Sequence, residues 1–211
     1  MSRSTKLYIA RHGQTEWNVA KRMQGHWDSP LTDLGVMQAE WLGAALKDVP
    51  FDAAYASSST RALRTAQLIM KKRDVTVVAR DQLREIQLGE WEGQEQETLA
   101  VQDPEQFHAF WKKPSTFRLP GAETFFDVQR RVLAELDKVL QEHAGETILI
   151  VSHSVAVKLM MAHFEGRDID RLWEPPYLHP TSLNVVEVID GQPSIRLYGD
   201  TSHYRKEVAE R

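Results

Sequence analysis

The stretch that most constrains the fold is the continuous apolar run TILIV at residues 147–151. A strand that is apolar on both faces is typical of the centre of a parallel sheet that helices cover on both sides. The run stops at Ser152 and His153, and a helical stretch follows that ends near Gly166. The sequence therefore predicts an α/β fold with this strand in the middle of the sheet.

A second strand with a polar end lies near the N-terminus. The apolar residues 7–10 run into Arg11, His12 and Gly13. In open α/β folds, ligands bind just beyond the carboxyl ends of the parallel strands. Gly13 lets the backbone turn sharply and approach a ligand closely. We therefore treat His12 as a candidate for chemistry.

A third junction follows residues 51–56, which read as another strand. The hydroxyl side chains of residues 57–60 are predicted to cap the next helix, which carries Arg61 in its first turn. A cation at a helix N-terminus is unfavourable by roughly 0.3–1 kcal/mol at an exposed site. An anion shared between Arg61 and the backbone N–H groups would remove this penalty.

The alternation of strands and helices predicts a three-layer α/β/α fold around a mostly parallel sheet. Residues 75–79 supply a further strand, and residues 182–189 and 194–198 form a hairpin or a pair of edge strands. We expect one domain over residues 1–211, since no linker or composition break divides the chain. Residues 94–120 are expected to be an excursion that covers the strand ends.

Composition excludes several classes of function. The chain of 211 residues carries 26 Lys and Arg against 30 Asp and Glu, a net charge of −4, which offers no bulk attraction for nucleic acid or an anionic membrane. It has no cysteine, which excludes disulfides, thiolate catalysis and cysteine-ligated metal sites. No apolar stretch is long enough for a signal peptide or membrane span, so we expect a cytoplasmic protein.

The three junctions are expected to meet at one edge of the sheet. They would bring the guanidinium groups of Arg11 and Arg61 together with two imidazoles, His12 and His153. A site so rich in positive character is suited to an anion, and the planar arginine fork matches phosphate oxygens. Phosphate is the natural candidate.

Five groups of residues occur in order along the chain: Arg11-His12-Gly13 with Thr15 and Asn18, Pro30-Leu31-Thr32 with Gly35 and Gln38, residues 57–66 around Arg61, Glu85 with Gly89-Glu90-Trp91-Glu92-Gly93, and Val151-Ser152-His153. In these residues and their spacing the sequence resembles the histidine phosphatase superfamily, also called the phosphoglycerate mutase-like family. The resemblance covers essentially the whole chain, and within the superfamily the sequence is most similar to the compact, broad-specificity phosphatases of the bacterial branch.

The resemblance implies a phosphatase for small phosphomonoesters that works through a phosphohistidine. His12 would be the nucleophile, and Arg11, Arg61 and His153 would hold the phosphoryl oxygens. Glu85 would be the general acid that protonates the leaving oxygen and then the base that activates water. The resemblance implies no cofactor and no metal.

Further residues are carried over as substrate contacts. Asn18, Gln24 and the Gly25 backbone are expected to contact phosphate or substrate, and Ser57 is a further candidate. The family commonly has glycine directly after the second histidine, where this chain has Ser154. This serine would either narrow the pocket, or cap the helix and touch the phosphate.

Three alternatives compete with a phosphatase. A phosphoglycerate mutase would use the same phosphohistidine but needs more basic residues, whereas residues 94–120 offer only Lys112, Lys113 and Arg118 as cations. A non-catalytic phosphate-ligand binder on the same fold would be expected to have lost a catalytic residue. A metal-dependent phosphoesterase could be built on the eight histidines, but the sequence has no His-x-His or Asp-rich cluster of metal ligands.

Aromatic residues in the second half of the chain fit either a core or an apolar pocket. They are Phe107, Phe110, Trp111, Trp173 and Tyr177. The sequence identifies neither the physiological substrate nor the oligomeric state.

Overall fold

The computed structural model describes residues 4–205, whose centre is one six-stranded sheet. Its strands are β1 (Ser4–Arg11), β2 (Ala53–Ser57), β3 (Val77–Arg80), β4 (Thr147–Ser152), β5 (Leu183–Ile189) and β6 (Gln192–Asp200). The spatial order is β3-β2-β4-β1-β5-β6, in which the first four strands are parallel and the last two antiparallel. The predicted mostly parallel sheet and the terminal hairpin are confirmed.

Strand β4 lies between two parallel neighbours, as its apolar run predicts. Ile150 pairs with Ile9 of β1 on one side and with Tyr55 of β2 on the other. Ser152, the last residue of β4, pairs with Arg11, the last residue of β1. This register brings the two strand ends with their histidines to the same level of the sheet edge.

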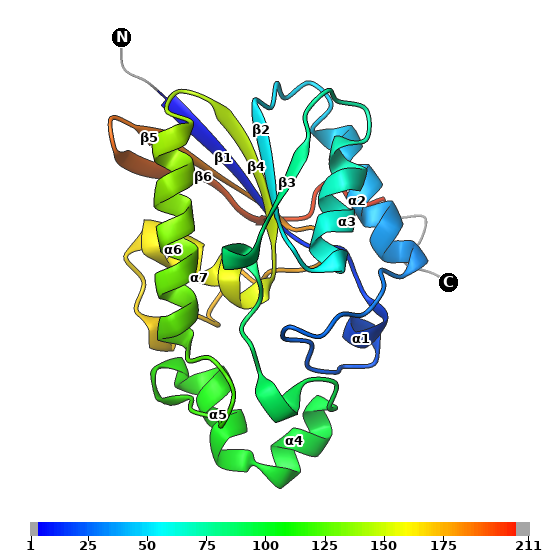
Figure 1. Ribbon diagram of the computed structural model, residues 1–211, viewed down its shortest axis with the longest axis vertical. Helices are drawn as coiled ribbons and strands as arrows, with labels where there is room; N and C mark the ends of the chain where they lie inside the picture. The colour runs from blue at the N-terminus through cyan, green and yellow to red at the C-terminus, as the bar shows by residue number, and fades with distance from the viewer. Residues whose placement is uncertain (1–3, 206–211) are drawn as a thin grey trace.

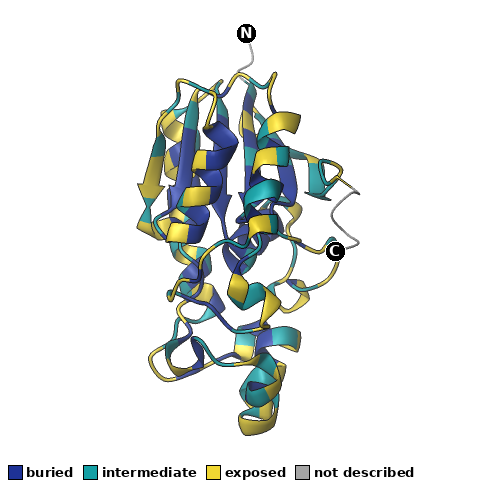
Figure 2. Cartoon of the chain, turned by 90° about the vertical axis from the view of Figure 1, so that its right-hand side faces the viewer, coloured by how far each residue is buried: buried dark blue, intermediate teal, exposed yellow. Residues whose placement is uncertain are grey.

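Two pairs of helices cover the sheet and bury separate faces of β4. Leu149 and Val151 belong to the cluster packed under α2 (Asp33–Ala45) and α3 (Thr60–Met70). Ile148 and Ile150 belong to the larger cluster under α6 (Phe125–Glu142) and α7 (Ser154–Glu165). The result is the three-layer arrangement of Figure 1, with the buried strands between more exposed helices in Figure 2.

Residues 94–120, which follow the acidic loop of residues 83–93, lie beyond the carboxyl ends of the parallel strands, at the lower end of the molecule in Figure 1. This segment contains α4 (Gln96–Gln102) and α5 (Pro104–Lys112), while the short α1 (Glu16–Val19) follows β1 on the same side. Single turns of 3-10 helix lie at Asp81–Leu83, Gly89–Trp91, Pro114–Thr116 and Ile169–Arg171. No helix within residues 4–205 combines the length and apolar character needed to span a bilayer.

Side-chain caps form at two helices, whereas the hydroxyl cap predicted for a third is wrong. Thr32 caps α2 by accepting a hydrogen bond from the Gly35 N–H, and Thr124 caps α6 in the same way. The expected hydroxyl cap of α3 does not form, because Ser59 makes no side-chain capping bond. The Thr60 N–H instead donates to the carboxylate of Asp28, which arrives from a distant loop.

Candidate active site

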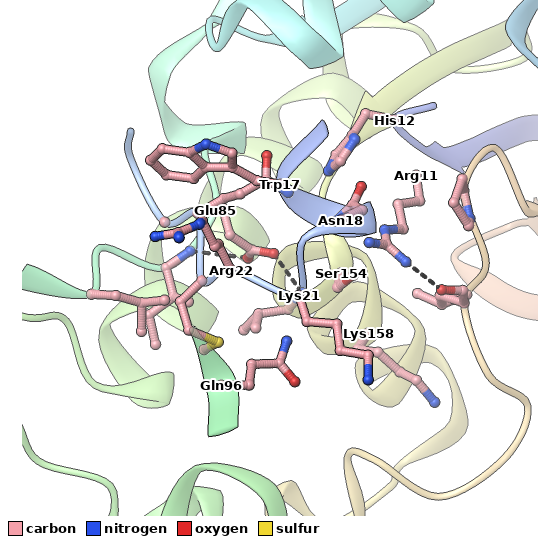
Figure 3. Close-up of a pocket in the computed structure, with 18 of the residues that line it drawn as sticks. Arg11, His12, Trp17, Asn18, Lys21, Arg22, Glu85, Gln96, Ser154 and Lys158 are labelled. Atoms are coloured by element: carbon pink, nitrogen blue, oxygen red, sulfur yellow. Dashed lines mark hydrogen bonds between the residues drawn. The ribbon is translucent and has the colours of Figure 1, made fainter. Parts of the chain in front are cut away.

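A cavity of about 500 Å³ opens at the carboxyl ends of β1 and β4 (Figure 3). The predicted residues that line it are Arg11, His12, Asn18, Gln24, Gly25, Arg61, Glu85 and Ser154. His153 and Ser57 are fully buried beside it and do not line it. The junctions that the sequence expects to converge therefore do meet at one site.

His12 follows β1 and has a defined tautomer. Its Nδ1 lies 2.7 Å from the carbonyl oxygen of Gly13, and a carbonyl can only accept a hydrogen bond. The ring hydrogen is therefore on Nδ1, which leaves a lone pair on Nε2. Burial, with Arg61 and Arg11 nearby, lowers the pKa of His12 well below its ordinary value, so the ring is neutral at neutral pH.

His153 lies beside His12, with the two ring centroids 5.1 Å apart. Its Nε2 is 2.8 Å from the hydroxyl of Ser57, and that hydroxyl accepts a hydrogen bond from the Ser59 N–H. The chain of bonds favours a Ser57 hydroxyl that donates to Nε2, which leaves the hydrogen of His153 on Nδ1. Burial lowers the pKa of His153 well below its ordinary value, and Arg61, His12 and Arg11 add to this effect.

The two histidines are therefore neutral in this arrangement. The positive charge at the strand ends comes from Arg11 and Arg61. Neutral imidazoles serve different purposes: one can supply a lone pair, and the other a neutral N–H donor.

Arg61 is held by the loop that follows α1. Its guanidinium donates 2.8 Å to the Gly25 carbonyl, 2.9 Å to the Trp27 carbonyl and 2.9 Å to Asp28 Oδ1. Only 1% of the Arg61 side chain is exposed, so its direction is fixed by these bonds. Asp28 also offsets the unfavourable position of this cation in the first turn of α3.

Arg11 is anchored at one end and leaves donor capacity at the other. Its terminal nitrogen donates 2.8 Å to the Leu178 carbonyl. Within residues 4–205, the buried Nε atoms of Arg11 and Arg61 and the Oε1 of Gln24 have no hydrogen-bond partner. Buried polar atoms are almost always paired, so unpaired ones around a cavity indicate groups that a polar ligand satisfies.

Glu85 points into the cavity from the acidic loop, and 9% of the residue is exposed. Its carboxylate accepts hydrogen bonds from the Ile86 N–H at 3.0 Å and the Val155 N–H at 3.1 Å, the latter in the first turn of α7. Burial raises the pKa of Glu85 above its ordinary value, although these two bonds act in the opposite direction. A buried carboxyl of this kind is able to carry a proton.

The position of Glu85 excludes one of the two roles considered for Ser154, that of capping the helix. Ser154 is the first residue of α7, whose N-cap position is His153 without a side-chain capping bond. The Ser154 hydroxyl therefore does not cap the helix, and the carboxylate of Glu85 takes that place. Ser154 instead lines the cavity wall.

Sequence reasoning named Glu92 only as part of a matching motif and missed its role, which is to hold the loop around Gly25. Its carboxylate accepts hydrogen bonds from the N–H groups of His26, Trp27 and Leu88 at 2.8 to 3.0 Å. Gly25 has a φ of +55°, and a β-carbon there would lie 2.3 Å from the Glu92 carboxylate. Glu92 stands in the acidic loop, but its position in the sequence gives no sign that two of its partners lie 66 and 65 residues earlier in the chain.

The aromatic residues left open by the sequence divide between the two roles. Phe110, Trp111, Trp173 and Tyr177 line the cavity, whereas Phe107 packs against the core and does not. Two cations that sequence reasoning did not place at the site, Lys21 and Arg22, also line it. A third such cation, Lys158, lies on the opposite side of the drawn cavity from His12 (Figure 3).

The fold and the site define an α/β protein whose sheet edge holds two fixed arginines, two neutral histidines and a buried carboxyl around one cavity. In residues 4–205, no three side chains of His, Cys, Asp or Glu cluster in a way that could hold a metal ion. The profile of the histidine phosphatase superfamily, branch 1, matches residues 7–201, and the chain belongs to that superfamily. The match confirms the predicted class of enzyme, a phosphomonoester hydrolase of this superfamily.

Individual relatives cover most of the chain. Phosphoserine phosphatase 1 of Hydrogenobacter thermophilus is 32% identical over 168 residues, 80% of each chain. Phosphoglycerate mutase-like protein 4 of Arabidopsis thaliana is 30% identical over 94% of this chain and 86% of its own. The solved structure of Bacillus stearothermophilus YhfR is 43% identical, with a TM-score of 0.92 over 94% of this chain and 98% of that one.

Proposed function

We propose that the protein hydrolyses small phosphomonoesters of varied leaving group through a covalent intermediate on His12. The observation that carries the proposal is the tautomer of His12, whose Nδ1–H is fixed on the Gly13 carbonyl at 2.7 Å so that Nε2 keeps its lone pair. A histidine ring nitrogen can attack phosphorus only when it is unprotonated and its lone pair is free.

In the first step, the lone pair of His12 Nε2 forms a bond to phosphorus as the bond from phosphorus to the ester oxygen breaks. Glu85 gives its proton to that oxygen, which departs as an alcohol. In the second step, Glu85 takes a proton from water, the water oxygen attacks phosphorus, and the phosphorus–nitrogen bond breaks. Orthophosphate leaves, and Nε2 and the Glu85 proton are both restored.

The arginines and His153 stabilise the charge on the transferred group. Arg11 and Arg61 are fixed by backbone carbonyls before any substrate arrives, so they need little reorganisation during the reaction. The Nδ1–H of His153 offers a neutral donor beside them. Asn18, Gln24, Gly25 and Ser154 line the same cavity and are proposed as substrate contacts, whereas Ser57 is proposed to act through His153.

The leaving group is proposed to lie against the aromatic wall. Phe110 and Trp111, from residues 94–120, form one part of that wall with Gln96 nearby, so this segment acts as a cover in the proposal. We treat residues 1–211 as one domain, with small phosphoesters as its partners. The three cations of the cover, Lys112, Lys113 and Arg118, do not line the cavity, which favours a phosphatase. Lys21, Arg22 and Lys158 do line it, and they are the observation that keeps a mutase as the second candidate.

The test is a panel of phosphoesters, with and without a chelator, on the wild type and His12→Ala. We expect hydrolysis that a chelator does not reduce and that is lost in His12→Ala. Undiminished activity of His12→Ala would overturn the proposal, and loss of activity with the chelator would restore the metal-dependent alternative. Isomerisation of phosphoglycerate faster than hydrolysis of an aryl phosphate would favour the mutase.

A further inference from the structure

Lys158 is a buried cation that lines the cavity and has no role in the reaction proposed above. Only 2% of the residue is exposed, yet it lines the cavity. It stands four residues after Ser154 on α7, and residues at that spacing share one face of a helix. Burying an ammonium group is costly unless its donors are satisfied, so its partners are informative.

The partners of Lys158 are backbone carbonyls of a single segment. Its Nζ donates 2.7 Å to the carbonyl of Glu174 and 2.7 Å to that of Pro176. Arg167 binds the same stretch from outside, at 3.1 Å to Glu174 and 3.0 Å to the Pro175 carbonyl. Charge-assisted bonds of this length are stronger than those between neutral groups.

The segment that Lys158 holds carries part of the cavity wall. Trp173 donates its indole N–H to the Phe110 carbonyl at 2.6 Å, and its ring centroid lies 4.7 Å from that of Trp111. Tyr177 lines the cavity but is 62% exposed, so side-chain packing does little to hold it. Its place depends on the backbone just before it, which Lys158 holds at Pro176.

We propose that Lys158 is a positioning residue for specificity: its bonds to the Glu174 and Pro176 carbonyls fix Trp173 and Tyr177 as the wall that contacts an aromatic leaving group. The proposal rests on the proposed function, because a leaving group requires the phosphatase reaction. Arg11 binds the Leu178 carbonyl by a separate bond, so we expect loss of Lys158 to affect the aromatic wall more than the phosphoryl site.

The bonds from Lys158 to the Glu174 and Pro176 carbonyls depend on pH, because they are strongest when Lys158 is charged. Burial lowers the pKa of Lys158 to about 8, with Arg167 lowering it further and Glu165 and Glu174 opposing. The ring of Tyr198 lies 5.6 Å from Nζ, and burial raises the pKa of Tyr198 to about 12, so that phenol stays neutral when Lys158 titrates. As the pH rises through about 8, Lys158 loses its charge and its bonds to the carbonyls weaken.

The experiment compares phenyl phosphate, which has an aromatic leaving group, with ethyl phosphate, which has a small one. In Lys158→Met we expect KM for phenyl phosphate to rise about tenfold, with kcat for both substrates and KM for ethyl phosphate within about twofold of the wild type. Lys158→Arg keeps a charged donor and should recover most of the KM. Lys138→Met, an exposed lysine of α6, is the matched control and should change neither substrate.

Equal changes for the two substrates, or no change in KM for phenyl phosphate, would overturn the proposal. A second measurement does not depend on the variant folding: in the wild type, the ratio of KM for phenyl phosphate to that for ethyl phosphate should rise above pH 8. A flat ratio would contradict the role of Lys158. If the wild type hydrolyses neither ester, the proposed function fails, which is distinct from failure of the role of Lys158.

Discussion

At the scale of single residues, burial shifts the pKa values of His12 and Glu85 in opposite directions, and for each group it favours the neutral form. Desolvation disfavours the charged form, so it lowers the pKa of the imidazole and raises that of the carboxyl. A nucleophile must be unprotonated and a general acid protonated. One physical effect therefore prepares both groups for the proposed roles.

Replacing Glu85 by glutamine tests the role of general acid. An amide cannot give its proton to the leaving oxygen, so we expect kcat/KM for ethyl phosphate to fall by about 10²- to 10⁴-fold. Phosphorylation by p-nitrophenyl phosphate should fall much less, since its leaving group needs no proton. Rapid-quench measurement of released p-nitrophenol checks this, and an equal loss for both esters would argue against the role.

The pH dependence of kcat/KM follows from the same two groups. Glu85 must be protonated, and its pKa lies above the ordinary 4.5, so activity falls as the pH rises through that raised value. His12 must be neutral, and its pKa lies well below the ordinary 6.5, so its acid limb lies at low pH. We expect an acidic optimum whose alkaline limb disappears in Glu85→Gln. Titration of the substrate, near pH ~6, is common to both enzymes and serves as the internal reference.

At the scale of secondary-structure elements, the loop after α1 ties the site together. Asp28 contacts α3 twice, through the Thr60 N–H and the Arg61 guanidinium. Arg61 lowers the pKa of Asp28 below its ordinary value, although burial alone would raise it, so the carboxylate is charged at neutral pH. One side chain therefore both caps a helix and positions Arg61, the arginine proposed to bind phosphate.

Asp28→Ala removes both contacts. Loss of a helix N-cap costs about 1 kcal/mol, so we expect the free energy of unfolding to fall by about that amount in urea titrations. Activity should fall together with it, because Arg61 loses a fixed partner. Asp28→Asn keeps an acceptor for the Thr60 N–H and should retain most of the stability while still losing activity. Full activity in both variants would show that Asp28 does not position Arg61.

The helices and strands could be predicted, because the spacing of hydrophobic residues and the polar residues at strand ends are local features of the sequence. The apolar run at 147–151 identified β4, and the junctions placed Arg11, Arg61 and His153 at one edge. The cap of α3 could not be predicted, because Asp28 lies 32 residues before Thr60 and no pattern relates them. Local signals give elements, whereas the contacts that fix loops are set by the tertiary fold.

At the scale of the whole molecule, the site draws on residues spread along the chain from Arg11 to Pro180. The fold brings them together through the register of β1 with β4, which sets Arg11 level with Ser152. The roles of Glu92 and Lys158 could not be predicted, since a carboxylate and a lysine acquire partners only when loops meet them. The catalytic assignments themselves stay predictions that the following measurements address.

A ligand that binds only the folded state stabilises the whole molecule. Inorganic phosphate at a hundred times its Kd should add about 2.7 kcal/mol to the free energy of unfolding. For a chain of this size, that corresponds to a rise in Tm of about 5–10 °C. Thermal unfolding should show the rise in the wild type and in Lys138→Met, and its loss in Arg61→Met. An equal rise in Arg61→Met would place phosphate binding elsewhere.

The central claim is that His12 becomes phosphorylated. Its most direct test is to mix the enzyme with a ³²P-labelled phosphoester, quench within the first turnover and map the labelled peptide. We predict an acid-labile, base-stable label on His12 in the wild type and none in His12→Ala. A label that persists in His12→Ala, or turnover in the wild type without any labelled protein, would contradict the account.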